Sequence, residues 1–152
     1  MDKLEIKETL LDEVEALIYQ KIAVFQKMMD DAQDSANNET KSSAGDKFET
    51  GRAMMHMERD KNAQQLSEAR KLELFLSQIK SDKMFDRVAF GSVVQTDFGN
   101  YFISIAAGRI LVDEKKYFAI SPQAPLAKEL MQKEKGDMIT FNDKPIKILD
   151  VF

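Results

Sequence analysis

The chain has 152 residues, a formal net charge of −4 and a hydrophobic content of 43%, which is typical of a soluble protein with one or two small domains. It has no cysteine, which excludes disulfides, thiolate zinc sites and thiol nucleophiles and agrees with the cytoplasmic location that we expect. Its acidic balance argues against free duplex nucleic acid as a partner, because duplex binders are usually basic. We expect no membrane partner, since no apolar run approaches the roughly 20 residues of a membrane span and the charged N-terminus does not resemble a signal peptide. We also expect a monomer.

Two long segments, residues 6–36 and 48–79, have the periodicity of amphipathic helices. In the first segment Leu11, Ile18, Phe25 and Ala32 recur every seven residues, the spacing of a coiled-coil stripe. A polar break separates the segments, so we predict an antiparallel coiled-coil hairpin over residues 1–80 with an acidic tip near residues 37–49. Thirty helical residues extend about 45 Å. A purely structural coiled coil remains the alternative interpretation.

The periodicity changes after residue 80. Residues 81–86 are expected to form a linker, and residues 87–152 alternate between apolar and polar side chains, as strands do. We predict strands at 88–96, 101–106, 109–112, 117–120, 138–141 and 146–151, and a short helix at 125–132 that opens with Pro125. The turns are expected at 97–100, 113–114 and 142–144. The predicted class is therefore α+β, with a helical hairpin followed by an antiparallel sheet of five or six strands and one short helix.

An acidic pair, Asp46 and Glu49, lies at the predicted start of the second helix. Acidic residues at this position cap a helix and interact favourably with its dipole. The same carboxylates can instead serve as ligands of Mg²⁺, which takes oxygen ligands and often only one or two from protein carboxylates. Arg52 and Arg59 follow on the same helix, as solvated charges or as contacts to a phosphate backbone. His56 is the only histidine and has no second imidazole or thiolate with which to form a metal site.

Sequence signals of a self-contained enzyme are missing. The chain has neither a glycine-rich phosphate loop nor a Gly-x-Ser-x-Gly elbow. A hydrolytic triad would have to use His56, which lies within the predicted hairpin. We therefore expect no self-contained enzymatic activity.

Two stretches resemble the Gre transcript-cleavage factors of bacterial RNA polymerase. Residues 45–49 read Gly-Asp-Lys-Phe-Glu and resemble the family's tip motif, Gly-Asp-x-x-Glu. Residues 120–130 read Ile-Ser-Pro-Gln-Ala-Pro-Leu-Ala-Lys-Glu-Leu and resemble its C-terminal signature, Ile-Ser-x-x-Ser-Pro-Leu-Gly-x-x-Leu. The Gre factors have an N-terminal coiled-coil hairpin and a C-terminal FKBP-like domain, so the resemblance implies an FKBP-like domain over residues 87–152.

The resemblance also implies a transcription elongation factor that binds RNA polymerase at its secondary channel. The arm would enter the channel, where Asp46 and Glu49 would help the polymerase to hold a second Mg²⁺ and to cleave backtracked RNA. The chain would contact the RNA 3′ end indirectly. Arg52 and Arg59 are the residues that could contact the RNA backbone. The residues implied to dock on the polymerase are Ser121, Pro122, Pro125 and Leu126.

Two alternatives remain open. Residues 50–53 read Thr-Gly-Arg-Ala, whereas the family usually continues Asn-Ala-Glu-Tyr, and a regulator that occupies the channel without cleavage would tolerate this difference. The other alternative is an FKBP-like prolyl isomerase or chaperone, which would need a pocket of aromatic side chains, although their spacing along the predicted strands fits an ordinary core better. The aromatic candidates are Phe90, Phe98, Tyr101, Phe102, Tyr117, Phe118 and Phe141.

Overall fold

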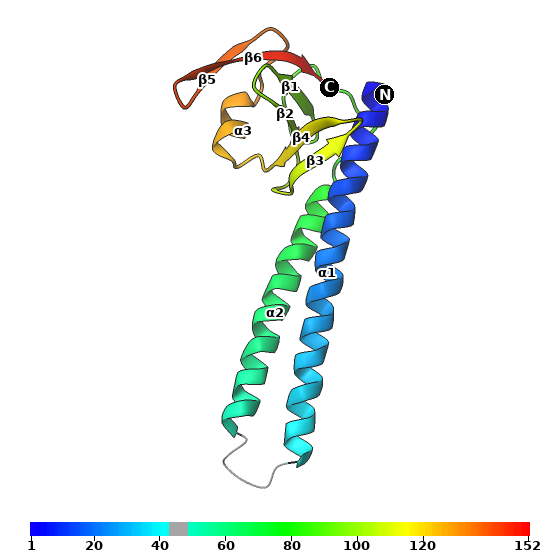
Figure 1. Cartoon of the computed structure of the whole chain (residues 1–152), viewed down its shortest axis with the longest axis vertical. Coiled ribbons are helices and arrows are strands. Elements are labelled where there is room, and N and C mark those ends of the chain that lie inside the picture. The colour runs from blue at the N-terminus through cyan, green and yellow to red at the C-terminus, as the bar shows by residue number, and fades with distance from the viewer. Residues whose placement is uncertain (43–48) are drawn as a thin grey trace. The chain divides into compact units, whose positions relative to one another are not determined.

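The computed structural model describes the backbone of residues 1–42 and 49–152, and the side chains of residues 1–35, 37 and 50–152 (Figure 1). The chain divides into two compact units, Ile18–Leu74 and the combination of Met1–Leu17 with Phe75–Phe152. We call the first the helical arm and the second the sheet unit. Helices α1 (Lys3–Ser42) and α2 (Glu49–Leu76) each contribute to both units. The expected ranges 1–80, 81–86 and 87–152 stay predictions about domain boundaries.

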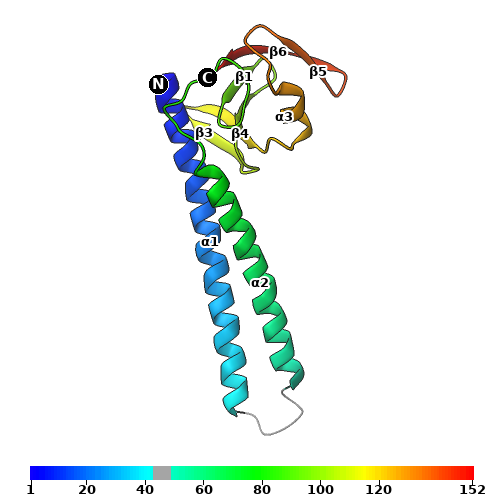
Figure 2. The ribbon, with the colours of Figure 1, turned by 180° about the vertical axis from the view of Figure 1, so that it is seen from behind.

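The helical arm consists of α1 and α2 running side by side in opposite directions (Figures 1 and 2). Apolar residues at three- and four-residue spacings put one stripe of each helix into the seam between them. The buried seam residues Ile18, Ala32, Leu66 and Ala69 have side chains exposed by 8% or less. The predicted antiparallel helical hairpin is therefore confirmed, with α1 extending six residues beyond its expected end at residue 36.

A polar side chain interrupts the seam. Asn62 is only 2% exposed, and its amide nitrogen has no hydrogen-bond partner among the residues that the structure describes. A buried amide donor without a partner loses its hydration without compensation. Asn62 therefore weakens the packing of the arm.

Replacement of Asn62 by leucine should stabilise the arm. Leucine has a similar size and removes the unsatisfied donor, so we expect the free energy of unfolding to rise by about 1 kcal/mol, measured by urea denaturation. Gln64→Leu makes the same chemical change at an exposed position of α2 and should alter stability by less than about 0.5 kcal/mol. A loss of stability in Asn62→Leu would show that the amide is satisfied in solution.

The sheet unit contains six strands and one short helix. The order across the sheet is β3-β4-β2-β1-β6-β5. Helix α3 (Pro125–Leu130) follows β4 in the chain. The strands are β1 (Val93–Thr96), β2 (Asn100–Ile103), β3 (Gly108–Val112), β4 (Lys115–Ile120), β5 (Met138–Phe141) and β6 (Lys144–Val151). This arrangement confirms the predicted α+β class of a helical hairpin followed by a sheet domain with one short helix.

Left-handed residue pairs make two of the predicted hairpin turns. Asp113 and Glu114 connect β3 to β4 with φ angles of 50° and 64°, and Asn142 and Asp143 connect β5 to β6 with 51° and 62°. Two-residue hairpin loops favour positive φ at both positions because the resulting twist matches that of the strands. In the third turn the Thr96 hydroxyl accepts hydrogen bonds from the backbone N–H groups of residues 98 and 99.

The structure corrects two details of the predicted sheet. The pairing of β2 with β4 is parallel, so the sheet is mostly rather than wholly antiparallel. The reason is that β4 forms a hairpin with β3 and then lies beside β2, with β3 at the sheet edge. The strand predicted at residues 88–96 begins only at Val93, because Gly91 adopts a φ of +92° and so leaves extended geometry.

The main core cluster of the sheet unit combines residues of β1, β2, β5 and β6 with α3. Ala127 and Leu130 of α3 are fully buried together with strand residues such as Ile103 and Ile148. Leu126 and Phe141 are partly buried against the same cluster. Among the described helices, none has both the length and the apolar character that crossing a membrane would require.

The start of α1 is held within the sheet unit by polar contacts. Asp2 and Glu5 exchange hydrogen bonds of 2.8 and 2.9 Å between backbone and side chain, which is a reciprocal helix cap. The Lys3 ammonium lies 2.9 Å from the Asp150 carboxylate. Lys7 is 1% exposed, and its ammonium donates a hydrogen bond to the backbone carbonyl of Lys83.

The buried ammonium of Lys7 is strongly perturbed. Burial, and secondly the charge of Lys83, lowers the pKa of Lys7 from 10.5 to about 8, although Asp82 acts in the opposite direction. Below pH 8 the group is charged in both the folded and the unfolded chain. Between about pH 8 and 10.5 the unfolded chain binds more protons than the folded chain, so stability contributed by this group rises with pH.

This linkage predicts a difference between wild type and Lys7→Met. The free energy of unfolding of wild type, measured by urea denaturation from pH 7.5 to 10, should rise relative to that of Lys7→Met, which has no ammonium at this position. Lys71→Met removes an exposed ammonium and should follow the pH dependence of wild type. Identical pH profiles for wild type and Lys7→Met would contradict the burial of this charge.

Candidate functional site at the end of the helical arm

The predicted acidic motif lies in the sequence between the end of α1 and the first residue of α2. Helix α1 ends at Ser42 and α2 begins at Glu49, within one residue of the predicted start. Asp46 lies outside the described residues, and for Glu49 the structure describes the backbone alone. The pairing of these two carboxylates therefore stays a prediction.

The two arginines that follow Glu49 have different surroundings. Arg52 is exposed. The Arg59 guanidinium donates a 2.6 Å hydrogen bond to the Gln33 side chain on α1 and a 2.8 Å hydrogen bond to the Asp60 carboxylate. The Gln33 amide in turn donates to the Asn37 side chain at 3.0 Å. Arg59 thus connects the two helices, whereas Arg52 is presented to solvent.

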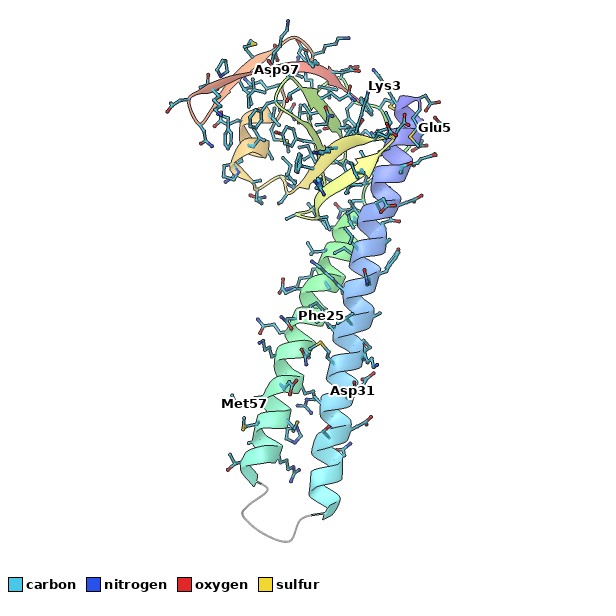
Figure 3. All side chains as sticks on the ribbon, viewed as in Figure 1. Lys3, Glu5, Phe25, Asp31, Met57 and Asp97 are labelled. Atoms are coloured by element: carbon cyan, nitrogen blue, oxygen red, sulfur yellow. The ribbon has the colours of Figure 1, made fainter. Side chains whose placement is uncertain are left out.

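The described surface near this end combines exposed acids with exposed methionines. Met54 and Met57 are 65% and 70% exposed, and Met57 lies on the side of α2 that faces away from α1 (Figure 3). Asp31 and Asp34 are exposed on α1. Within the described residues no group of three or more histidine or acidic side chains is close enough together to hold a metal ion. Flexible methionines adapt to varied partner surfaces, so this region is suited to contact with a macromolecule.

The bridge between Arg59 and Gln33 should determine the local stability of the end of the arm. Arg59→Ala removes the hydrogen bond that joins the two helices, which contributes about 1 kcal/mol because Arg59 is partly exposed. We expect amide hydrogen exchange in residues 30–37 and 55–62 to accelerate by about fivefold. Arg52→Ala removes an exposed arginine from the same helix and should leave these rates unchanged. Equal acceleration in both variants would contradict the bridge.

The residues implied to dock on the polymerase lie in the turn after β4 (Ser121 and Pro122) and at the start of α3 (Pro125 and Leu126). The Ser121 hydroxyl accepts a 3.1 Å hydrogen bond from the Gln123 N–H, which stabilises the turn into α3. Pro125 is exposed at the first position of α3, while Pro122 is half-buried and Leu126 packs partly against the core. Pro125 is therefore the docking candidate most accessible to a partner, and Leu126 has a structural role as well.

The aromatic residues considered for an isomerase pocket have different surroundings. Tyr101 and Phe118 are register partners with ring centroids 6.2 Å apart. Phe90 instead stacks on Phe75 at 4.2 Å, and Phe98 is 57% exposed. The remaining candidates are at least partly buried: Phe102, Tyr117 and Phe141.

Lys7 and Gln33 were not identified from the sequence as important residues. Lys7 lies seven residues before Val14, which places a charged side chain on the predicted apolar stripe and is the signal that could have marked it. Gln33 has no comparable signal, because its role depends on Arg59, which is 26 residues away.

Comparison with known proteins gives limited similarity to solved structures. No protein-family profile and no curated protein matches the chain. A solved structure described as "Structure of the transcription factor Gfh1" aligns with 90% of this chain and 92% of that chain, at 14% sequence identity and a TM-score of 0.36.

Proposed function

We propose that this chain is an accessory transcription elongation factor that acts in the cytoplasm by inserting the helical arm into the secondary channel of RNA polymerase. The observation that supports the proposal is the pair of long helices: α1 ends at Ser42 and α2 begins at Glu49. The motif of residues 45–49 therefore lies in the sequence where the chain passes from one helix of the arm to the other.

The geometry of the arm is suited to this task. Residues 18–42 of α1 extend about 37 Å at the helical rise. Two antiparallel helices packed along one seam form a narrow rod that resists bending better than a single helix. A rod of this kind places a few side chains deep inside a channel that a globular domain is too wide to enter.

The carboxylates of Asp46 and Glu49 are the proposed functional groups. Mg²⁺, when bound between these carboxylates and the acidic residues of the polymerase, would supply a Lewis acid that supports phosphodiester hydrolysis. The role of this chain is to bring carboxylate oxygens to the metal as ligands. Arg52, exposed one turn after Glu49, is placed to approach an RNA phosphate, whereas Arg59 is engaged in the bridge to α1.

Docking would use the turn after β4 and the start of α3. Pro125, the first residue of α3, is exposed, and the turn that precedes it is held by the hydrogen bond between Gln123 and Ser121. A rigid turn loses little conformational entropy on binding. The sheet unit is therefore proposed as the part of the chain that binds at the rim of the channel.

A second candidate is a channel-binding regulator that does not promote cleavage, and Arg52 is the observation that favours it. Arg52 follows the proposed metal ligand Glu49 by three positions on α2, a spacing at which helix side chains are neighbours, so its guanidinium would be a cation close to the proposed metal. A nearby cation weakens the binding of another cation.

RNA cleavage in a stalled, backtracked elongation complex distinguishes the two candidates. With the matching polymerase and Mg²⁺, the protein should accelerate cleavage, and Asp46→Ala/Glu49→Ala should lower the rate by at least about tenfold, since even supporting residues of metal sites contribute this much. Asp31→Ala/Asp34→Ala removes an exposed acidic pair with the same spacing from α1 and should retain cleavage.

Other results of this experiment distinguish among the candidate functions. Binding to the polymerase without cleavage, by wild type as well as by the variant, would support the regulator. Absence of binding would overturn both candidates. Prolyl isomerisation of a test peptide by a protein that does not bind polymerase would favour the isomerase instead.

A further inference from the structure

The sheet unit contains a cavity that the proposed function does not use. Its volume is about 340 Å³, which is within the range of small-molecule sites. It lies between residues at the C-terminal side of α2 and the segment that leads into the sheet. Its principal lining residues are Gln78, Lys80, Lys83, Phe85, Phe90 and Gly91.

The two aromatic rings of the cavity are held in place by other side chains. Phe90 stacks on Phe75 with ring centroids 4.2 Å apart and an interplanar angle of 33°. Phe85 packs partly against the core, and the ammonium groups of Lys7 and Lys83 lie 4.7 and 4.9 Å from its ring centroid. Rings fixed in this way offer an apolar surface that needs little reordering when a ligand binds.

Positive charge is in excess around the cavity. Lys80 and Lys83 line it, and Lys7 contacts two of its lining residues, Lys83 and Phe85. Among the described residues, no carboxylate lies within 4.0 Å of any of these three ammonium groups. The charge of Asp82 favours the charged form of Lys7 but does not offset burial and Lys83. An anion bound in the cavity would reduce the electrostatic repulsion among these ammonium groups.

Gly91 lines the cavity without a side chain of its own. Its φ of +92° is a conformation that other residues rarely adopt. A Cβ at this position would lie 3.4 Å from Ile79 and 3.8 Å from Phe85, both of which line the cavity. A larger side chain would therefore be strained and would occupy space next to the rings.

We propose that this cavity binds a small organic anion that carries a planar ring, such as a nucleoside monophosphate. The ring would lie against Phe85 and Phe90, and the anionic group would face Lys80 and Lys83. Lysine is suited to this role because its ammonium acts as a mobile point charge toward phosphate. The site consists only of residues of the sheet unit and does not depend on the function proposed for the arm.

Titration of the full chain with adenosine 5′-monophosphate, followed by NMR, tests the proposal. We expect saturable shifts of the amide signals of residues 78–91. Adenosine and inorganic phosphate, which supply the ring and the anion separately, should each bind at least about tenfold more weakly, a difference of about 1.4 kcal/mol. Lys80→Gln/Lys83→Gln should weaken binding of the monophosphate by at least the same factor.

Lys115→Gln/Lys116→Gln is the matched control, because it removes the same charge from exposed positions of β4 and should bind like wild type. Absence of saturable shifts in residues 78–91 would overturn the proposal. So would equal weakening by both double variants, which would indicate general electrostatic attraction, and equal affinity for phosphate and for the monophosphate, which would leave no role for the rings.

Discussion

The helical arm depends on one constraint: two helices share a single seam in which to bury apolar side chains. A bundle of three or four helices has a central core, but in a pair each helix exposes most of its circumference. Ile18 and Leu66 are buried in the seam, whereas Val24 and Met28 of α1 remain 49% and 42% exposed. Stability of the arm therefore depends on a narrow stripe, and each polar residue in that stripe has a large effect.

Polar side chains act in the arm in two opposite ways. Asn62 occupies seam volume without a hydrogen-bond partner among the described residues, while Arg59 joins α2 to α1 through Gln33. Buried polar groups of this kind reduce stability but can specify one register between helices. One turn away, in the half of α2 that lies closer to Glu49, the polar groups of Arg59 and Gln33 satisfy each other.

In the sheet unit, charged side chains join the start of α1 to other segments. Lys7 is buried, but its ammonium is satisfied by a backbone carbonyl and lies against the Phe85 ring. The ion pair between Lys3 and Asp150 holds the preceding turn of α1 near the end of β6. Together these contacts bind the start of α1 to the segment that leads into the sheet and to the last strand. They also leave the excess of positive charge from which the anion site is inferred.

The sequence by itself determined the elements that depend on near neighbours. The heptad stripe through Leu11 and Ile18 predicted α1, and the polar pairs at 113–114 and 142–143 predicted two hairpin turns, because helix periodicity and turn chemistry are encoded within a few residues. The resemblance of residues 45–49 to a known motif likewise required only adjacent positions. The parallel pairing of β2 with β4, the separation of the aromatic residues, and the burial of Lys7 beside Phe85 were decided by the tertiary structure. Each of these depends on contacts between segments distant in the chain, whose free energy is realised only when the fold brings them together.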